Sequence, residues 1–180
     1  MFFRKRKKSK EEIKRDLARL LIYAKQGIIR SDYFLHKIHS KIEDLELKYI
    51  SIEDPQVKAV LRKELSQLRR LETLLAKFSI ALEVVATKIE TILLTGTAIW
   101  NLVVIKEIIK ELKKSELTSI PELGLVIEEL ANGTLSTINN AEIILPEGYS
   151  DIALKEEAAR ILKEAEVAAE AKIKSLEESP

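Results

Sequence analysis

Residues 61–92, LRKELSQLRRLETLLAKFSIALEVVATKIETI, decide the fold of this 180-residue chain. Apolar residues recur there at intervals of four and three, with one stutter, at Leu61, Leu65, Leu68, Leu71, Leu75, Phe78, Leu82, Val85, Ile89 and Ile92. This is the heptad spacing of a helix with one long apolar seam. The rhythm runs on to about Lys114 and predicts one helix of nearly 60 residues or two helices of roughly 40 and 17. Thr95, Gly96 and Thr97 mark the hinge between the two, because glycine and β-branched residues have low helix propensity.

A second long helix is predicted upstream, from about Ser9 to Ile50. Pro55 and the residues just before it interrupt the pattern, since proline disfavours the helical conformation of the residue that precedes it and suits a helix's first turn. The break is short, so the two helices turn back on each other as an antiparallel hairpin. The upstream seam follows the same spacing, at Leu17, Leu21, Ala24, Ile28, Ser31, Leu35, Ile38, Ile42, Leu45 and Tyr49.

Shorter helices are expected after the hairpin. Ser119 is the candidate N-cap of a helix that reaches about Leu145 and weakens at residues 132–134, and residues 146–149 (PEGY) break the chain. A last helix begins at Ser150 or Asp151 and ends near Leu176, with a small apolar face of Leu154, Ala158, Ile161, Ala165 and Ala168. The expected fold is all-α: a long antiparallel helical hairpin, shorter helices and an acidic C-terminal helix. We divide it into a basic N-terminus (1–10), a helical core (11–145) and an acidic regulatory tail (146–180).

The composition argues against enzymatic chemistry. Five Gly and no Cys exclude Gly-rich phosphate loops, disulfides, Cys-ligated zinc and thiol nucleophiles. His36 and His39 could share a helix face, but no third ligand accompanies them, so we interpret both as polar-face residues and expect neither a metal nor a cofactor. Residues 84–105 are apolar but contain Lys88 and Glu90, and we interpret them as a buried helix rather than a membrane span. Acidic residues follow the basic N-terminus directly, which does not fit a secretory signal.

Charge is distributed unevenly along the chain. Residues 1–114 hold 25 Lys and Arg against 15 Asp and Glu, whereas residues 115–180 hold 5 against 14. The N-terminus concentrates the positive charge, and its candidate membrane-binding residues are Phe2, Phe3, Arg4, Lys5, Arg6, Lys7, Lys8 and Lys10. Aromatic rings beside cations suit an anionic membrane surface. The same cations would bind nucleic-acid phosphates or act as a solubilising tail, so those interpretations stay open.

The ordered set of helices resembles the ESCRT-III family, and most of all its archaeal cell-division branch, the CdvB-like proteins. The resemblance covers most of the chain and is carried by residues 67–72 (QLRRLE), 91–96 (TILLTG), 120–123 (IPEL) and 127–130 (IEEL). It implies a non-enzymatic protein that polymerises on anionic membranes, with itself and with paralogous subunits, to constrict or cut them in cell division or vesicle budding. It also implies a closed monomer autoinhibited by its tail and an AAA ATPase that extracts subunits.

Two details differ from the family pattern. The nearest match to the ATPase-docking positions is Asp151, Leu154, Ala158 and Ile161, with Glu157 where the family has Arg. The Pro-rich and winged-helix-like segments of the longer division protein are missing, so we expect a shorter paralogue at the cytoplasmic face of the membrane, near the division site. We do not expect a nucleic-acid partner, although a nucleic-acid-associated helical protein or a passive coiled-coil scaffold remains the alternative.

The predicted seam can be tested at Ile38. Ile38→Asp places a carboxylate in an apolar seam and should lower the free energy of unfolding by several kcal/mol, measured by thermal or urea unfolding. Lys37→Ala, one position off the seam, should leave stability nearly unchanged. Equal stability of the two variants would show that the register is wrong.

Overall fold

The chain folds into five α-helices and one short 3₁₀ helix. A computed structural model describes residues 8–178, and within that span the regular structure is entirely helical, which confirms the all-α prediction. The elements are α1 (Lys10–Ser51), α2 (Pro55–Thr95), α3 (Asn101–Lys113), the 3₁₀ helix η1 (Glu116–Ser119), α4 (Pro121–Asn140) and α5 (Asp151–Glu177).

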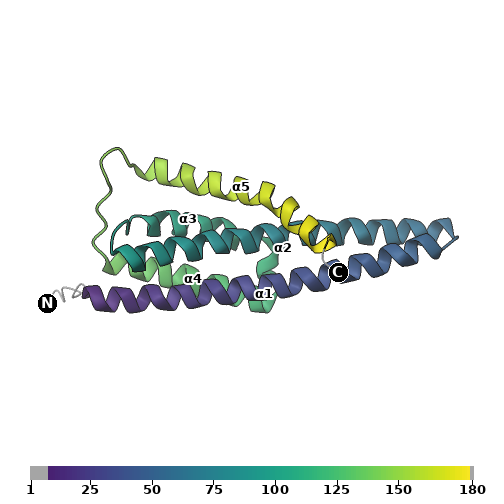
Figure 1. Ribbon diagram of the computed structural model, residues 1–180, viewed down its shortest axis with the longest axis horizontal. Coiled ribbons are helices and arrows are strands. Elements are labelled where there is room, and N and C mark those ends of the chain that lie inside the picture. The colour runs from purple at the N-terminus through teal and green to yellow at the C-terminus, as the bar shows by residue number, and fades with distance from the viewer. Residues whose placement is uncertain (1–7, 179–180) are drawn as a thin grey trace.

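Helices α1 and α2 form the predicted antiparallel hairpin and give the molecule its length (Figure 1). α1 has 42 residues and α2 has 41, so each is about 60 Å long. Ser9 begins α1 with a capping box, in which its hydroxyl accepts a hydrogen bond from the Glu12 amide and the Glu12 carboxylate accepts one from the Ser9 amide. Asp54 caps α2 through the Gln56 amide, and Pro55 occupies the first turn. The box fixes the start of α1, and Asp54 with Pro55 fixes the turn at the hairpin tip.

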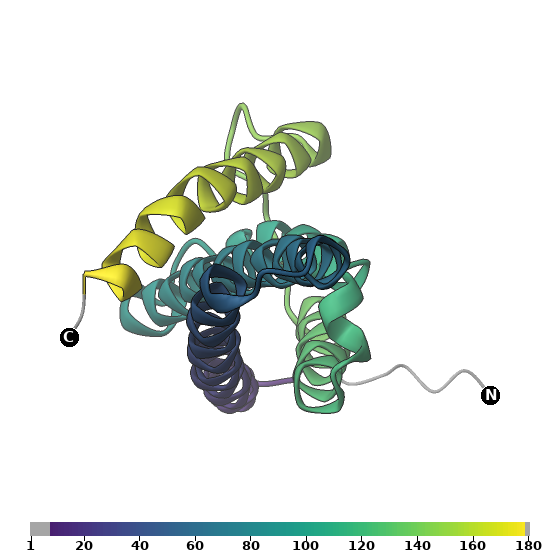
Figure 2. The same ribbon diagram turned by 90° about the vertical axis from the view of Figure 1, so that its right-hand side faces the viewer.

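The two predicted seams meet inside the hairpin. All ten predicted seam residues of α1 and all those of α2 between Leu61 and Ile92 are buried or half-buried. Helices α3 and α4 extend this core: α2 contacts α3, α3 contacts α4, and α4 contacts α1, so four helices enclose one apolar interior. Only part of the hairpin is covered in this way, and its tip projects beyond the other helices (Figure 1). α5 lies against α2 and α3, on the side of α2 away from α1 (Figure 2).

Two glycines allow α4 to approach α1 closely. A Cβ atom at Gly27 would lie 2.8 Å from Leu82 Cδ1 and 2.9 Å from Val126 Cγ1, so α1, α2 and α4 meet at this residue. A Cβ at Gly133 of α4 would lie 2.6 Å from Leu20 Cδ2. Real side chains do not tolerate these separations without displacement of the neighbour. The spacing of the apolar seams contains no sign of these contacts, because glycine has no side chain to mark a face.

The hinge separates α2 from α3, which confirms the two-helix form of the prediction. α2 ends at Thr95, and Gly96 caps it in the left-handed conformation with φ of 63°. Ala98 also has positive φ, 59°, which is unfavourable for a residue with a Cβ. Residues 84–105 therefore are not the single buried helix expected from their hydropathy, because the hinge divides them between α2 and α3.

Three further details correct the sequence interpretation. Ser119 is not the N-cap of α4; its hydroxyl donates to the Glu116 carbonyl inside η1, and Ile120 precedes the helix without a side-chain cap. α4 ends at Asn140 rather than near Leu145, and it continues without a break through residues 132–134 because that turn packs on α1. On α5, Ala169 is buried and Ala168 is exposed, so the apolar face turns slightly from the predicted one.

Gly27 provides a test of the three-helix contact. Gly27→Val adds atoms where Leu82 and Val126 already lie, and we expect the free energy of unfolding to fall by about 1–3 kcal/mol. The control is Gln26→Val, which adds the same side chain at an exposed neighbouring position and should cost only a few tenths of a kcal/mol through its lower helix propensity. Urea unfolding of the two variants checks this, and equal midpoints would contradict the packing.

Candidate functional site

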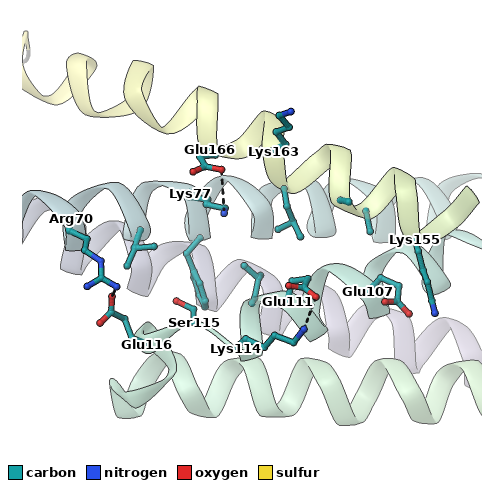
Figure 3. Close-up of a pocket in the computed structure, with 16 residues that line it drawn as sticks. Arg70, Lys77, Glu107, Glu111, Lys114, Ser115, Glu116, Lys155, Lys163 and Glu166 are labelled. Carbon is teal, nitrogen blue, oxygen red and sulfur yellow. Dashed lines mark hydrogen bonds and ion pairs between the residues drawn. The ribbon is translucent and has the colours of Figure 1, made fainter. Parts of the chain in front are cut away.

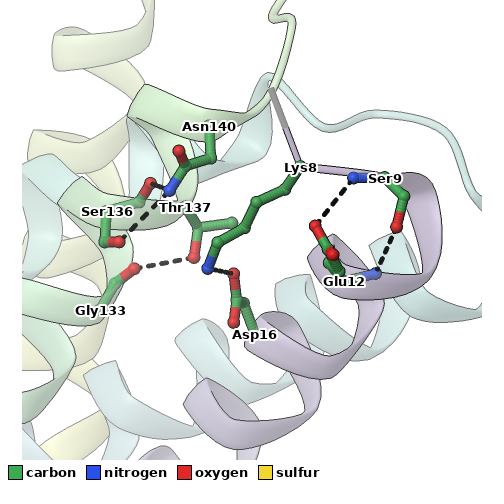
Figure 4. A network of polar contacts seen from close by, with 8 residues as sticks. All are labelled: Lys8, Ser9, Glu12, Asp16, Gly133, Ser136, Thr137 and Asn140. Atoms are coloured by element: carbon green, nitrogen blue, oxygen red, sulfur yellow. Dashed lines mark hydrogen bonds and ion pairs between the residues drawn. The ribbon is translucent and has the colours of Figure 1, made fainter. Parts of the chain in front are cut away.

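The predicted membrane-binding N-terminus lies largely outside the described residues, which begin at Lys8. Of that set the structure places Lys8 and Lys10. The Lys8 ammonium lies 2.8 Å from the Asp16 carboxylate of α1 (Figure 4). Lys10 is the first residue of α1 and is exposed. Lys8 therefore pairs with an acid of α1. Lys10 is unobstructed at the start of α1, the helix that also carries a cationic surface.

That surface, which we call the outer face of α1, is a continuous strip of exposed residues without an acid. Its residues follow one another at helical spacing, and all of them are exposed: Arg15, Ala18, Arg19, Ile22, Lys25, Gln26, Ile29, Tyr33, His36, Lys37 and Ser40. The strip spans 25 helical steps and is therefore roughly 38 Å long. It combines cations with three large apolar side chains that are more than half exposed, namely Ile22 (56%), Ile29 (69%) and Tyr33 (53%).

Neighbouring contacts hold the edges of this face in place. The Lys37 ammonium lies 4.7 Å from the centre of the Tyr33 ring, and Lys25 pairs with Glu90 of α2 at 3.2 Å. From the sequence we placed Lys37 off the seam but did not identify this face. The signal that could have found it is the seven-residue repeat of Arg15, Ile22 and Ile29, which places apolar and basic residues together on the side opposite the seam.

Three of the four predicted ATPase-docking residues lie on the inner side of α5. Leu154, Ala158 and Ile161 are 0%, 2% and 8% exposed because they pack against the bundle, whereas Asp151 is exposed at the start of the helix. In this conformation the three apolar side chains are therefore inaccessible to another protein. Their role in the structure is to dock α5.

Polar contacts complete the docking of α5, and they have mixed sign. The Lys88 ammonium of α2 bridges Asn101 Oδ1 at 3.1 Å and Glu157 Oε1 of α5 at 3.3 Å, which joins both sides of the hinge to α5. Farther along, Lys172 of α5 lies 2.9 Å from the Asp32 carboxylate of α1 and donates to the Ser79 hydroxyl of α2 at 3.1 Å. In the Lys172 contact the tail supplies the cation and the hairpin supplies the acid. This is the reverse of an acidic tail on a basic hairpin, so the net charges of the two segments do not explain the docking.

A groove of about 850 Å³ remains between α5 and the α2–α3 side of the bundle (Figure 3). Its floor is apolar, and its rim alternates in charge: Arg70 pairs with Glu116 at 2.8 Å, and Lys114 pairs with Glu111 at 3.0 Å. Lys77 reaches toward Glu166 of α5 at 3.8 Å. A rim of alternating sign does not offer the continuous positive charge that a nucleic-acid backbone requires.

The two histidines differ, which corrects the interpretation of both as polar-face residues. His36 is exposed, but His39 is buried and its Nδ1 lies 2.7 Å from Oε2 of the buried Glu72. No local pattern indicates this pair, since its members are 33 residues apart in the chain. Among residues 8–178 the side chains form no cluster that would hold a metal ion. None of the described helices is long and apolar enough to cross a membrane.

Comparisons with known proteins identify two archaeal relatives. Cell division protein B1 of Sulfolobus acidocaldarius is 27% identical over 170 residues, which cover 93% of this chain and 79% of that protein. Cell division protein B3 of the same organism is 28% identical over 164 residues, which cover 89% of this chain and 95% of that protein. No family model and no solved structure matches the chain significantly.

The long hairpin followed by shorter packed helices is consistent with an ESCRT-III-like protein. The two relatives make the assignment more specific, because they align with most of the chain and not only with the hairpin. They confirm the resemblance predicted from the sequence: the chain is a CdvB-like homologue of archaeal cell division proteins.

The mixed-sign docking of α5 can be tested at Lys172. Lys172→Met removes the ammonium that joins Asp32, Ser79 and α5, and the partly exposed pair should contribute about 1 kcal/mol. We expect hydrogen exchange of α5 amides to accelerate about fivefold, while exchange in α1 and α2 stays unchanged. Lys163→Met, an exposed position on the same helix, is the control. Equal exchange in both variants would show that Lys172 does not hold α5.

Proposed function

We propose that this protein binds anionic membrane surfaces through the outer face of α1 and polymerises there as part of a cell-division machinery. The observation that carries the proposal is the acid-free, exposed strip from Arg15 to Ser40, in which cations alternate with Ile22, Ile29 and Tyr33. The names of the two relatives support a role in cell division. Residues 1–7 lie outside the described part of the chain, and we expect their aromatic rings and cations to increase the affinity.

The physical basis is the combination of charge and apolar area on one rigid helix. A cation near an anionic lipid surface contributes roughly 1 kcal/mol, so Arg15, Arg19 and Lys37 together give a substantial but salt-sensitive attraction. Exposed isoleucine and tyrosine side chains enter the interface and add affinity that salt does not screen. Because α2 and α4 pack on other sides of α1, the strip can lie flat on a membrane without rearrangement of the bundle.

The docked α5 supports a regulatory part of the proposal. With α5 in place, Leu154, Ala158 and Ile161 are covered; when α5 leaves, they and the surface of α2 beneath them become available. We therefore infer that the described conformation is a closed monomer, that the hinge at residues 95–97 opens during assembly with the same or paralogous subunits, and that an AAA ATPase engages α5 only after release. The protein would then act as a peripheral component at the cytoplasmic face of the division site.

Liposome sedimentation tests the membrane proposal directly. The full chain should pellet with vesicles rich in anionic lipid and not with neutral vesicles. Arg19→Glu combined with Lys37→Glu should weaken binding by about tenfold or more, because each charge reversal replaces attraction to the lipid with repulsion. Ile22→Ser combined with Ile29→Ser should weaken the salt-resistant part of the binding. Deletion of residues 1–7 should reduce affinity further.

Controls of matched chemistry lie on other helices. Lys110→Glu with Lys113→Glu reverses two exposed charges on α3, and Leu125→Ser with Leu135→Ser removes two half-exposed apolar side chains from α4. Both should bind like the parent, and negative-stain microscopy should show polymers on the vesicles. Unaltered binding of the α1 variants would reject the surface. Binding to DNA without binding to vesicles would favour the nucleic-acid alternative, and neither activity would favour a passive scaffold.

A further inference from the structure

The apolar interior of the hairpin is interrupted at one level by a buried ionisable pair. The main core ends near Leu35 and Leu75, and a smaller cluster of Ile42, Leu65 and Leu68 stabilises the projecting tip. Between the two clusters lie His39 of α1, 9% exposed, and Glu72 of α2, 6% exposed. A buried polar pair in a helical seam stabilises the fold less than apolar packing does, and it favours the one register in which its partners meet.

The geometry around His39 favours the protonated ring. Nδ1 lies 2.7 Å from Glu72 Oε2, so Nδ1–H donates to that carboxylate. Nε2 is buried without a hydrogen-bond partner, yet it lies 3.3 Å from the Glu43 carboxylate. In the neutral ring with Nδ1 protonated, Nε2 presents a lone pair toward this acid; in the cation, it presents N–H. Protonation therefore replaces a repulsive contact with the Glu43 carboxylate by an attractive one.

Helix α5 ends over this pair. The cavity beside His39 is lined by charged groups from three helices: Glu43 and Glu46 of α1, Arg69 and Glu72 of α2, and Glu170, Lys174 and Glu177 of α5. Acids outnumber the cations Arg69 and Lys174 there. The C-terminal end of a helix carries partial negative charge and is stabilised by a nearby cation. A cationic His39 thus attracts the end of α5 through both its acids and its helix dipole.

The direction of the His39 pKa agrees with this geometry. Burial of the ring disfavours the charged form, but the hydrogen bond to Glu72 and the charges of Glu72, Glu43 and Glu177 outweigh it, so the pKa of His39 is raised above 6.5. The stabilisation that follows is fully present below pH 6.5 and is lost as the pH rises through the raised pKa.

We propose that His39 makes the docking of the last two turns of α5 dependent on pH: the imidazolium holds residues 170–177 on the hairpin, and the neutral imidazole releases them. The observation behind it is that one buried imidazole faces carboxylates from α1, α2 and α5. We call this contact between His39 and residues 170–177 of α5 the His39 clasp. It lies at the end of α5 opposite to the Lys88 contact, so release begins at the C-terminal end of the helix. The pH dependence requires neither lipid nor a second subunit, so an experiment can test it independently of the proposed membrane binding.

A distance measurement on the full chain tests the clasp. The protein has no cysteine, so Ser66→Cys on α2 and Ser175→Cys on α5, both exposed, accept a donor and an acceptor dye. Single-molecule energy transfer then gives the ratio of docked to undocked α5. Between about pH 6 and about pH 8.5 we expect that ratio to fall roughly three- to tenfold.

Three variants separate the clasp from a general effect of pH. His39→Gln retains a donor for Glu72 but cannot become cationic, and it should abolish the dependence on pH. Glu177→Gln, an exposed change that leaves the hairpin intact, should reduce the dependence and weaken docking at low pH. His36→Gln, at the exposed histidine one turn away, should retain the full dependence. A ratio that does not change with pH in the parent, or a full dependence that survives in His39→Gln or Glu177→Gln, would overturn the proposal.

Discussion

The antiparallel contact between the α1 and α2 seams is the interaction on which the rest of the structure depends. Helices of about forty residues owe most of their stability to tertiary packing rather than to propensity, so neither would persist without the other. The contact also determines which side of α1 faces solvent. Since α2 takes one side of α1 and α4 takes another through the close approach at Gly27, the strip from Arg15 to Ser40 is the side that remains. Its exposure is a consequence of the core, which explains how one helix serves both as scaffold and as candidate membrane surface.

Polar residues in the hairpin occur where α5 crosses it. Ser79 and Asp32 receive Lys172, Lys88 joins Asn101 to Glu157, and His39 with Glu72 lies beneath the last turns of α5. The apolar face of α5 is composed largely of alanines, which bury little area each. α5 is therefore attached mainly by small apolar side chains and several polar contacts, whereas α3 and α4 add mostly large apolar side chains to the same core. This difference is why the proposed function makes α5 the element that leaves the bundle.

Residues beside the hinge contact both α5 and the segment that leads into it. Trp100, directly before α3, packs on Tyr149 of the segment that leads into α5, with ring centres 4.7 Å apart. Lys88 makes a second connection at the same end. Movement of α5 would break the contact of Tyr149 with Trp100 and that of Glu157 with Lys88, and both lie near Ala98, whose positive φ strains the hinge backbone.

The sequence by itself determined the helices, because its signals are local. The four–three spacing of the seams, Pro55, Gly96 and Ser150 indicate where most helices begin and end, and the structure agrees apart from Ser119 and the C-terminal end of α4. The capping box at Ser9 and the proline at 121 are equally local signals. Tertiary structure decided what depends on residues far apart in the chain. Only packing turned Ala169 rather than Ala168 inward, paired His39 with Glu72, gave Lys172 acidic partners and made Gly27 and Gly133 points of contact. A periodic pattern reports which side of a helix is buried, but the partner of each buried group is set by how whole helices cross.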